Sequence, residues 1–327
     1  MRKKIAAFML AAILLTGCVP AIIQSPQSTH NSSTSSATTA TTTSTTTATV
    51  PSLTEPATTA PAPTTNPTTA PAPTIVPTTA PVLNGWQDAD GNRYYYVSGK
   101  PITGWQEIDG TQYYFREDGR MARGKVVLSD TETRYFTSSG KEILLVNPWN
   151  ALPADYTVKT ITYTYNRSVA EICYQPLCQM IADCEAATNR VVVQSAYRTQ
   201  DDQIYLYENK VSWLMRQGLS REQAEIKAGK VIAIPGTSEH QLGLAVDLAD
   251  ITYSNLDEAQ ENTPVQKWLM EHCWEYGFIL RYPNGKTEKT GIIYEPWHYR
   301  YVGMELAMEL RDSGLCLEEY LEQLTEE

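Results

Sequence analysis

Ser238-Glu239-His240-Gln241-Leu242-Gly243-Leu244-Ala245-Val246-Asp247 is the stretch from which the fold of this chain can be inferred. Pro235-Gly236, just before it, predicts a turn. Apolar residues then alternate with small or charged residues at a period of two, which is typical of a half-buried strand. Leu244, Val246 and Leu248 fall on one face, and Gly243, Ala245 and Asp247 fall on the other. The stretch therefore predicts a loop that runs into a strand.

The strand face that carries Asp247 is otherwise made of very small side chains. Gly243 and Ala245 leave a hollow beside the carboxylate, as a metal ion and its substrate would require. His240 precedes Asp247 by an odd number of residues, so one straight strand would place them on opposite faces. His240 must therefore reach the hollow from the loop before the strand. A catalytic zinc site uses three protein ligands and one open position, so a third ligand is expected.

The chain has only four histidines, and His30 lies in a low-complexity tract. His298, within Tyr294–Tyr301, is the predicted third ligand. His272 lies in the middle of a predicted helix and is expected to be structural or exposed. Two imidazoles and a carboxylate would hold Zn²⁺ in a site that lowers the pKa of a bound water to about 7. For His240 and Asp247 taken alone, a chance spacing or a core hydrogen bond is the alternative.

Taken together, these motifs resemble those of a known family. The pattern S-x-H-x-x-G-x-A-x-D at 238–247, followed by E-x-W-H at 295–298, is similar to the VanY-type zinc D-alanyl-D-alanine carboxypeptidases and their L,D-carboxypeptidase relatives. The resemblance covers roughly residues 143 to 327 and includes Val146–Asn150 and Ser195–Arg198. It implies a Zn²⁺ cofactor and peptidoglycan stem peptides as substrate.

The resemblance also implies a role for Glu295 as general base. This carboxylate would take a proton from the attacking water and return it to the leaving amine. Pro296 biases Glu295 toward an extended backbone. Because Glu295 and His298 are three residues apart, a regular strand would point them in opposite directions, so a local irregularity is expected. The alternative is that Glu295 is a surface carboxylate.

Four further residues are candidates for contacts with the substrate. Arg198 follows a predicted strand, and its guanidinium could bind the developing oxyanion or the terminal carboxylate of the peptide. Its alternative is a surface arginine at a helix entry. By resemblance, Gln203, Ser238 and Trp297 would line the peptide pocket. The alternatives are that Gln203 is solvated on a helix and that Ser238 caps a turn.

The first residues read as a targeting segment. Arg2-Lys3-Lys4 is followed by an apolar run, Ile5–Leu15, that is shorter than the about 20 residues needed to span a bilayer. Leu15-Thr16-Gly17-Cys18 resembles a lipobox, so residues 1–18 predict a lipoprotein signal peptide with Cys18 as the lipidated residue. An ordinary cleaved signal peptide is the alternative. Either way we expect an exported protein, and the lipobox predicts one anchored to the outer face of the membrane of a Gram-positive-type bacterium.

Composition separates two segments from the rest. Residues 19–83 are rich in Thr, Pro and Ala and predict a disordered linker, because almost no apolar area can be buried there. Residues 84–141 contain a repeat in which Gly85-Trp86-Gln87 recurs as Gly104-Trp105-Gln106, each followed by Asp-Gly and then aromatic residues. Each unit predicts one β-hairpin.

The repeats resemble the choline-binding or cell-wall-binding repeats of surface proteins. In those repeats, aromatic side chains form cages for choline through cation–π contacts. A wall polymer or choline is therefore a predicted partner. The alternative is that the aromatic side chains form the core of the repeat segment itself.

Residues 142–327 predict one globular carboxypeptidase domain. A capping box at Ser168–Glu171 predicts a helix to Ala187. The other predicted elements are a strand at 190–196, helices at 199–218, 220–230 and 263–276, and a strand pair at 278–282 and 291–301. Helices mixed with antiparallel strands in this order predict an α+β fold. The cysteines lack C-x-x-C spacing, which argues against a cysteine zinc site.

These features predict a membrane-tethered zinc carboxypeptidase that removes the C-terminal D-alanine of peptidoglycan stem peptides. Whether the scissile bond is D,D or L,D stays open. A peptidoglycan endopeptidase with the same zinc site is one alternative, and a non-catalytic wall-binding lipoprotein is another. The net charge of −11 argues against a nucleic-acid partner, because phosphates attract a basic surface.

Overall fold

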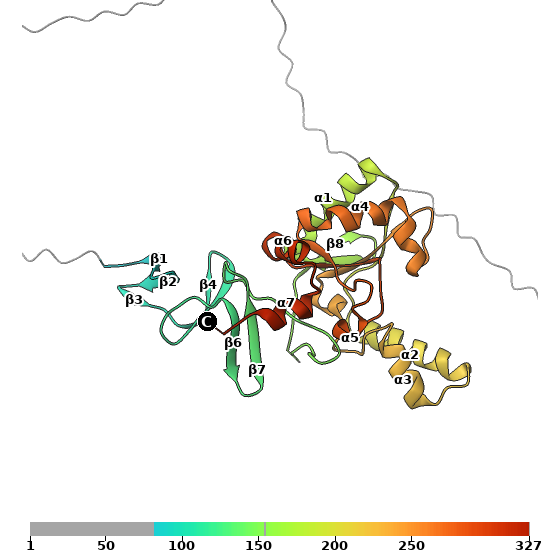
Figure 1. Cartoon of the computed structure of the whole chain (residues 1–327), viewed down its shortest axis with the longest axis horizontal. Coiled ribbons are helices and arrows are strands. Elements are labelled where there is room, and N and C mark those ends of the chain that lie inside the picture. The colour runs from blue at the N-terminus through green and yellow to red at the C-terminus, as the bar shows by residue number, and fades with distance from the viewer. Residues whose placement is uncertain (1–81, 154, 327) are drawn as a thin grey trace, which may run out of the picture. The chain divides into compact units, whose positions relative to one another are not determined.

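The computed structural model describes residues 82–153 and 155–326 (Figure 1). The predicted signal peptide with Cys18, and nearly all of the predicted linker at 19–83, lie outside these residues. In the part of the chain that the structure describes, no helix is both long and apolar enough to cross a bilayer.

The repeat segment folds into three β-hairpins, and the first two are the predicted repeat units. In the first two hairpins the turn is an Asp-Gly pair, Asp90-Gly91 and Asp109-Gly110, and all four residues have a φ between 51° and 76°. Positive φ at both central positions is what a type I′ turn requires, and Gly adopts it without strain. The strands are β1 (Gly85–Ala89), β2 (Asn92–Val97), β3 (Lys100–Pro101), β4 (Gly104–Ile108), β5 (Thr111–Phe115), β6 (Gly124–Ser129) and β7 (Glu132–Phe136).

Aromatic side chains connect one hairpin to the next. The Trp86 ring lies 5.1 Å from the ring of Tyr113 in the second hairpin, between ring centroids. The Trp105 ring lies 5.9 Å from that of Phe136 in the third hairpin. In addition, the Arg93 guanidinium lies 4.7 Å from the Trp86 centroid. These aromatic residues therefore form much of the core of the repeat segment, the alternative raised above.

A four-stranded antiparallel sheet forms the centre of the part of the chain that follows the repeat segment. Its order is β10-β11-β13-β12, so the two middle strands come from parts of the chain that are far apart. The four strands are β10 (Val191–Ser195), β11 (Ala245–Asp250), β12 (Phe278–Leu280) and β13 (His298–Tyr301). A separate hairpin, β8 (Thr160–Thr164) with β9 (Arg167–Ala170), precedes the first long helix. The α+β prediction is confirmed.

Helices α1 (Glu171–Ala187) and α4 (Pro264–His272) lie side by side against the sheet (Figure 1). Their apolar residues, such as Leu177 and Leu269, pack on Val246 and Leu248 of β11. A 3-10 turn, η3 (Cys273–Tyr276), extends α4 and ends at Gly277, whose φ is 77°. The helix predicted over 263–276 is thus confirmed as two joined segments.

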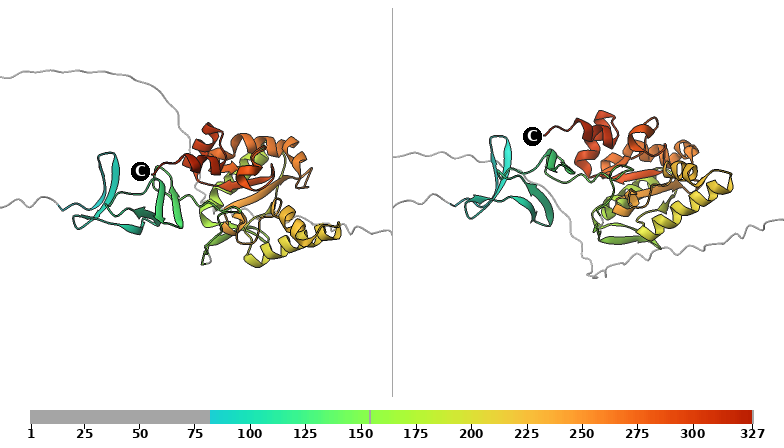
Figure 2. Two further views of the ribbon diagram at one scale, coloured as in Figure 1. Left: turned by 60° about the horizontal axis from the view of Figure 1, so that its bottom comes forward. Right: turned by 90° about the horizontal axis from the view of Figure 1, so that it is seen from below.

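Helices α2 (Gln200–Arg216) and α3 (Arg221–Gly229) form a helical hairpin, the yellow pair in Figures 1 and 2. Both begin within one residue of the predicted starts, and a capping box at Thr199 and at Ser220 fixes each start. The remaining elements are η1 (Glu239–Leu242), η2 (Glu258–Asn262), α5 (Thr287–Thr290), α6 (Met304–Ser313) and α7 (Leu317–Gln323).

Three local predictions are wrong. Ser168 does not cap α1, because its backbone belongs to β9, and the helix begins at Glu171 after an uncapped Ala170. Strand β11 is buried on both faces rather than half-buried. The second strand of the pair predicted at 291–301 starts only at His298, and α5 occupies part of the preceding loop.

The five cysteines of the described residues are free thiols.

Candidate active site

His240 is held by the short helix η1 in front of β11. Its Nδ1 lies 2.8 Å from the carbonyl oxygen of Ala196. A carbonyl only accepts, so Nδ1 carries the proton and Nε2 presents its lone pair to the site. Gly243 closes η1 with a φ of 72°, and a Cβ there would meet the Ala170 nitrogen at 3.1 Å. Glycine at this position thus lets the chain turn from η1 directly into β11.

Asp247 and His298 lie next to each other on adjacent strands, because the pairing of β11 with β13 places Asp247 directly opposite His298. The Asp247 Oδ1 lies 3.0 Å from the His298 Nδ1, and its Oδ2 lies 3.3 Å from the His240 Nε2. One ligand atom from each of the three residues lies within 4.8 Å of the others, and all three side chains are buried. The structure therefore brings together the three predicted ligands.

The donor set fits a zinc ion. Zn²⁺ is commonly held by imidazole nitrogens and carboxylate oxygens, with one position left open in catalytic sites. The His240 Nδ1–H on a backbone carbonyl supplies the outer hydrogen bond that orients a histidine ligand. The other ring nitrogen of His298, Nε2, is buried and lies 3.8 Å from the Glu239 Oε2.

Glu295 enters the same site through a tight turn. The His298 amide donates to the Glu295 carbonyl at 3.1 Å, so the chain reverses between the two residues. The Glu295 Oε2 lies 3.7 Å from the His298 Nδ1. Only 7% of Glu295 is exposed, so the alternative of a surface carboxylate is wrong. Burial, with the negative charge of Asp247 added, raises the pKa of Glu295 to about 8.

The two histidines differ in charge state. Burial and the nearby Arg198 guanidinium lower the pKa of His240 to about 4, so its imidazole is neutral. Burial also disfavours the charged form of His298, but the hydrogen bond to Asp247 and the nearby Glu239 carboxylate outweigh it and raise its pKa to about 9. In the absence of metal, His298 is therefore the positive partner of the Asp247 carboxylate.

Arg198 lies beside Asp247 and is fixed by three contacts. Its Nη2 donates to the Asp247 Oδ2 at 3.1 Å, its Nη1 to the Gln203 Oε1 at 3.0 Å, and its Nε to the Ser195 Oγ at 2.9 Å. Gln203 is fully buried, and its amide nitrogen donates to the Ala233 carbonyl. The alternative of a solvated Gln203 is wrong, and the structure places this residue behind Arg198 rather than on the cavity wall.

A cavity of about 230 Å³ opens over these groups. Arg198, Glu295, Ser238, Trp297 and the three predicted ligands all line it. The rest of the wall is largely apolar and comes from Leu206, Val231, Ile232, Ala233, Leu256, Tyr282 and Ile292. The cavity thus combines one cluster of ionisable groups with a small apolar wall.

Comparison with known proteins agrees with this geometry. The family described as VanY, D-alanyl-D-alanine carboxypeptidase, matches residues 166–304. The solved structure of VanYB in complex with D-alanine-D-alanine is 39% identical, with a TM-score of 0.51, and the match covers 55% of this chain and 97% of that one. The chain belongs to the VanY family.

Two further relatives of this VanY-family chain are informative. A variant of a vancomycin-resistance D,D-pentapeptidase VanY in complex with Zn(II) is 39% identical, with a TM-score of 0.50, over 54% of this chain and 97% of that one. A D-alanyl-D-alanine carboxypeptidase of Enterococcus faecalis is 43% identical over 181 residues, which are 55% of this chain and 65% of the relative. The chain spans between 44% and 65% of the curated relatives that it matches. A choline-binding repeat family matches residues 102–149.

Sequence reasoning missed two neighbours of His298 in this VanY-family site. The Tyr282 ring lies 4.7 Å from the His298 ring between centroids. Glu239, on the opposite side, belongs to a buried cluster of charges with Arg281 and Arg300. The only signal for Glu239 is its position next to His240. His272, by contrast, lies at the C-terminal end of α4 and pairs with Glu275, away from the site, as expected.

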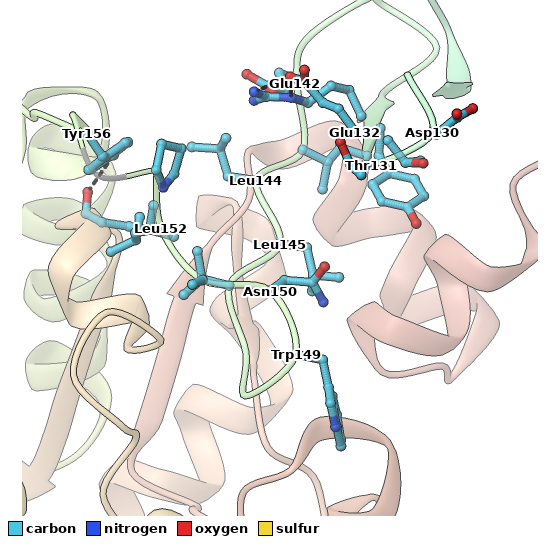
Figure 3. A pocket seen from close by; sticks show the side chains of 18 residues that line it. Asp130, Thr131, Glu132, Glu142, Leu144, Leu145, Trp149, Asn150, Leu152 and Tyr156 are labelled. Carbon is cyan, nitrogen blue, oxygen red and sulfur yellow. Dashed lines mark hydrogen bonds and ion pairs between the residues drawn. The ribbon is translucent and has the colours of Figure 1, made fainter. Parts of the chain in front are cut away.

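A larger cavity, of about 560 Å³, lies elsewhere (Figure 3). It is lined by residues of the β6–β7 hairpin and of the segment 142–156, together with Leu242 of η1. Figure 3 shows Asp130, Thr131 and Glu132 at one end and Trp149 at the other. None of the predicted site residues lines this cavity, so it is separate from the VanY-type site.

Proposed function

We propose that this protein is a zinc-dependent carboxypeptidase that removes the C-terminal D-alanine from peptidoglycan stem peptides. The observation that carries the proposal is the buried set of His240, Asp247 and His298 at the base of a cavity that also contains Glu295 and Arg198. Membership of the VanY family supports the reaction, and the Zn(II) and D-alanine-D-alanine complexes of two relatives support the cofactor and the substrate class.

His240, Asp247 and His298 would hold the metal through Nε2, a carboxylate oxygen and Nδ1. When bound, Zn²⁺ supplies a Lewis acid that polarises the scissile carbonyl and activates water. The residues themselves set the geometry. Strand pairing fixes Asp247 against His298, and the Ala196 carbonyl fixes the tautomer of His240. The backbone thus decides where the ligand atoms lie.

Glu295 is the proton carrier in this proposal. A base works best when its pKa lies near the operating pH, and burial raises the pKa of Glu295 to about 8. In its ionised form, the carboxylate accepts the proton of the attacking water, and it then returns that proton to the leaving D-alanine amine. Its backbone turn keeps the carboxylate beside the ligand His298 and inside the cavity.

Arg198 and the apolar wall bind the end of the peptide. The guanidinium is held in place by Gln203 and Ser195, so it can direct a fixed positive charge at a carboxylate or at a developing oxyanion. The small apolar wall suits the methyl side chain of alanine. Ser238 and Trp297, which line the same cavity, are proposed to contact the peptide as well.

The test is incubation of the purified protein with tetrapeptide and pentapeptide stems, with and without a chelator, followed by mass spectrometry. Loss of a single alanine that the chelator blocks supports the proposal, and the substrate that reacts shows whether the bond is D,D or L,D. Cut crosslinks in muropeptides would instead identify an endopeptidase. No cleavage together with no bound zinc would indicate a non-catalytic wall-binding protein.

We also propose that the repeat segment holds the enzyme at the cell wall through a quaternary ammonium group such as choline. The match to a choline-binding repeat family supports this role. Trp105 is 39% exposed and offers part of its ring to a cation. Retention on a choline-substituted resin tests the proposal, and failure of the full chain to bind would contradict it.

The membrane anchor is a separate proposal and rests on the sequence. Residues 1–18 are proposed to export the chain, with Cys18 as the lipidated residue that faces the enzyme toward the wall. Metabolic labelling with a fatty acid tests this, with Cys18→Ala as the control. Label that remains in the Cys18→Ala variant would contradict the assignment.

A further inference from the structure

Two buried polar atoms face each other behind the predicted ligand His298. The His298 Nε2 and the Glu239 Oε2 lie 3.8 Å apart. Neither atom has a hydrogen-bond partner among the residues that the structure describes. Glu239 is completely shielded from solvent, and only 4% of the His298 side chain is exposed. An unpaired buried polar atom carries a desolvation cost, so this facing pair calls for an explanation.

The other oxygen of Glu239 is firmly held. Its Oε1 accepts from the Arg281 Nε at 2.8 Å and from the Arg300 Nη1 at 2.7 Å. Arg281 in turn forms a bidentate ion pair with Glu318 of α7. Its Nη1 donates to the Glu318 Oε2 at 2.8 Å, and its Nη2 donates to the Oε1 at 2.6 Å. Two arginines and two glutamates therefore form a charge-balanced buried cluster. The cluster leaves one oxygen of Glu239 directed at His298.

The cluster is tied to several distant segments. The Asn147 amide donates to the Glu318 Oε1 at 3.1 Å, and the Arg300 Nη2 donates to the Leu144 carbonyl at 2.9 Å. Glu239 itself neighbours the predicted ligand His240, and Arg300 lies two residues after His298 on β13. The carboxylate of Glu239 is thus held in place by contacts that link β13, α7 and the segment before β8.

We propose that Glu239 is a positioning residue that accepts the Nε2–H of His298 and so keeps Nδ1 directed at the metal. This inference rests on the proposed zinc site. Once Nδ1 has given up its proton, the remaining ring proton belongs on Nε2, where the carboxylate can accept it. Outer hydrogen bonds of this kind orient a ligand and raise its basicity, and their loss typically weakens metal binding by about 10- to 100-fold.

The alternative is that Glu239 serves only to neutralise Arg281 and Arg300. Glu318 provides the matched control, because it neutralises Arg281 in the same cluster but does not face His298. Glu239→Gln distinguishes the two explanations. If the amide oxygen still accepts from the arginines, the amide NH₂ faces His298 Nε2 and favours the tautomer protonated on Nδ1, which cannot bind metal.

The experiment measures zinc affinity by competition with a chromophoric chelator for the wild-type protein, Glu239→Gln and Glu318→Gln. We expect Glu239→Gln to lose about 10- to 100-fold in affinity, while Glu318→Gln stays close to wild type even if its thermal stability falls. Equal affinities for the two variants, whether lowered or not, would overturn the proposal. A wild-type protein that binds no zinc would refute the proposed function itself.

A second measurement needs no variant and so covers a Glu239→Gln protein that fails to fold. In the zinc-loaded wild-type protein, long-range ¹H–¹⁵N spectra of labelled histidines report which ring nitrogen of His298 carries the proton. A slowly exchanging proton on Nε2 supports the proposal. A proton on Nδ1, with Nε2 bound to the metal, would overturn it.

Discussion

Glu295 and His298 are three residues apart, and yet both side chains point into one cavity, with 3.7 Å between the Glu295 Oε2 and the His298 Nδ1. A straight strand would separate them. The structure resolves this with a turn in which the His298 amide donates to the Glu295 carbonyl, so that β13 begins only at His298. The turn places the proposed base beside a proposed ligand.

Replacement of the proposed base should separate chemistry from metal binding. We expect Glu295→Gln to keep its zinc and its fold but to lose about 100- to 10,000-fold in kcat, the usual contribution of a general base. Metal analysis and stem-peptide turnover, measured on the same preparation, check this. A Glu295→Gln enzyme with wild-type kcat would refute the assigned role.

Loss of any proposed ligand should remove both metal and activity. We expect His240→Ala, Asp247→Ala and His298→Ala to be purified without stoichiometric zinc and without turnover. The matched control is His272→Ala, because His272 pairs with Glu275 outside the cavity. Zinc content measured by mass spectrometry checks the prediction, and it fails if His272→Ala loses as much zinc as the three ligand variants.

Zinc affinity should rise with pH. In the metal-free protein the pKa of His298 is raised to about 9, so near neutral pH the ring carries a positive charge. A metal binds only the neutral imidazole and must displace that proton. Apparent affinity should therefore rise about tenfold per pH unit below pH 9 and level off above it. Chelator competition between pH 6.5 and 9.5 measures this, and a flat profile would contradict it.

The turn that leads to Glu295 should depend on Gly291. Its φ is 78°, and a Cβ there would come within 2.6 Å of the Pro148 Cγ. Gly285 has the same φ but open space around it, which makes Gly285→Ala the matched control. We expect Gly285→Ala to cost about 1–2 kcal/mol for the left-handed backbone. Gly291→Ala should cost a further 1–3 kcal/mol, roughly, for overpacking.

Denaturant unfolding followed by circular dichroism gives both free energies of unfolding. Equal losses in the two variants would mean that Pro148 moves aside at little cost. The Gly291→Ala variant should also lose turnover, since the displaced loop carries Glu295.

Much of the site could be predicted because the spacing of its residues along the sequence indicates which of them lie on a strand and which on a loop. Asp247 falls in a predicted strand, and its odd spacing to His240 indicates that the histidine comes from a loop. The structure agrees, with His240 in η1 and Asp247 in β11. Helix starts at Thr199 and Ser220 were predictable for a similar reason, because the capping interactions are local.

The hollow predicted beside Gly243 and Ala245 is wrong. Gly243 lies in the turn before β11, next to Ala170, and neither Gly243 nor Ala245 lines the cavity.

Predictions failed where distant parts of the chain decide the local structure. The residues after Ser168 match a capping box. However, Ser168 lies in β9 and pairs with Thr162 of β8, so strand pairing overrides the local capping motif. Strand β11 was predicted to be half-buried because the alternation of apolar and small or charged residues does not show which elements cover its second face.

The ion pair between Glu239 and Arg281 could not be predicted either. The two residues are 42 positions apart, and their pairing leaves no periodic pattern in the sequence.

The most direct test of the account is anomalous diffraction at the zinc edge from crystals of the zinc-loaded protein. The account predicts one strong peak about 2.0–2.2 Å from the His240 Nε2, the His298 Nδ1 and an Asp247 oxygen, within the cavity that contains Glu295. A peak at any other place, or no peak in protein that cleaves stem peptides, would contradict it.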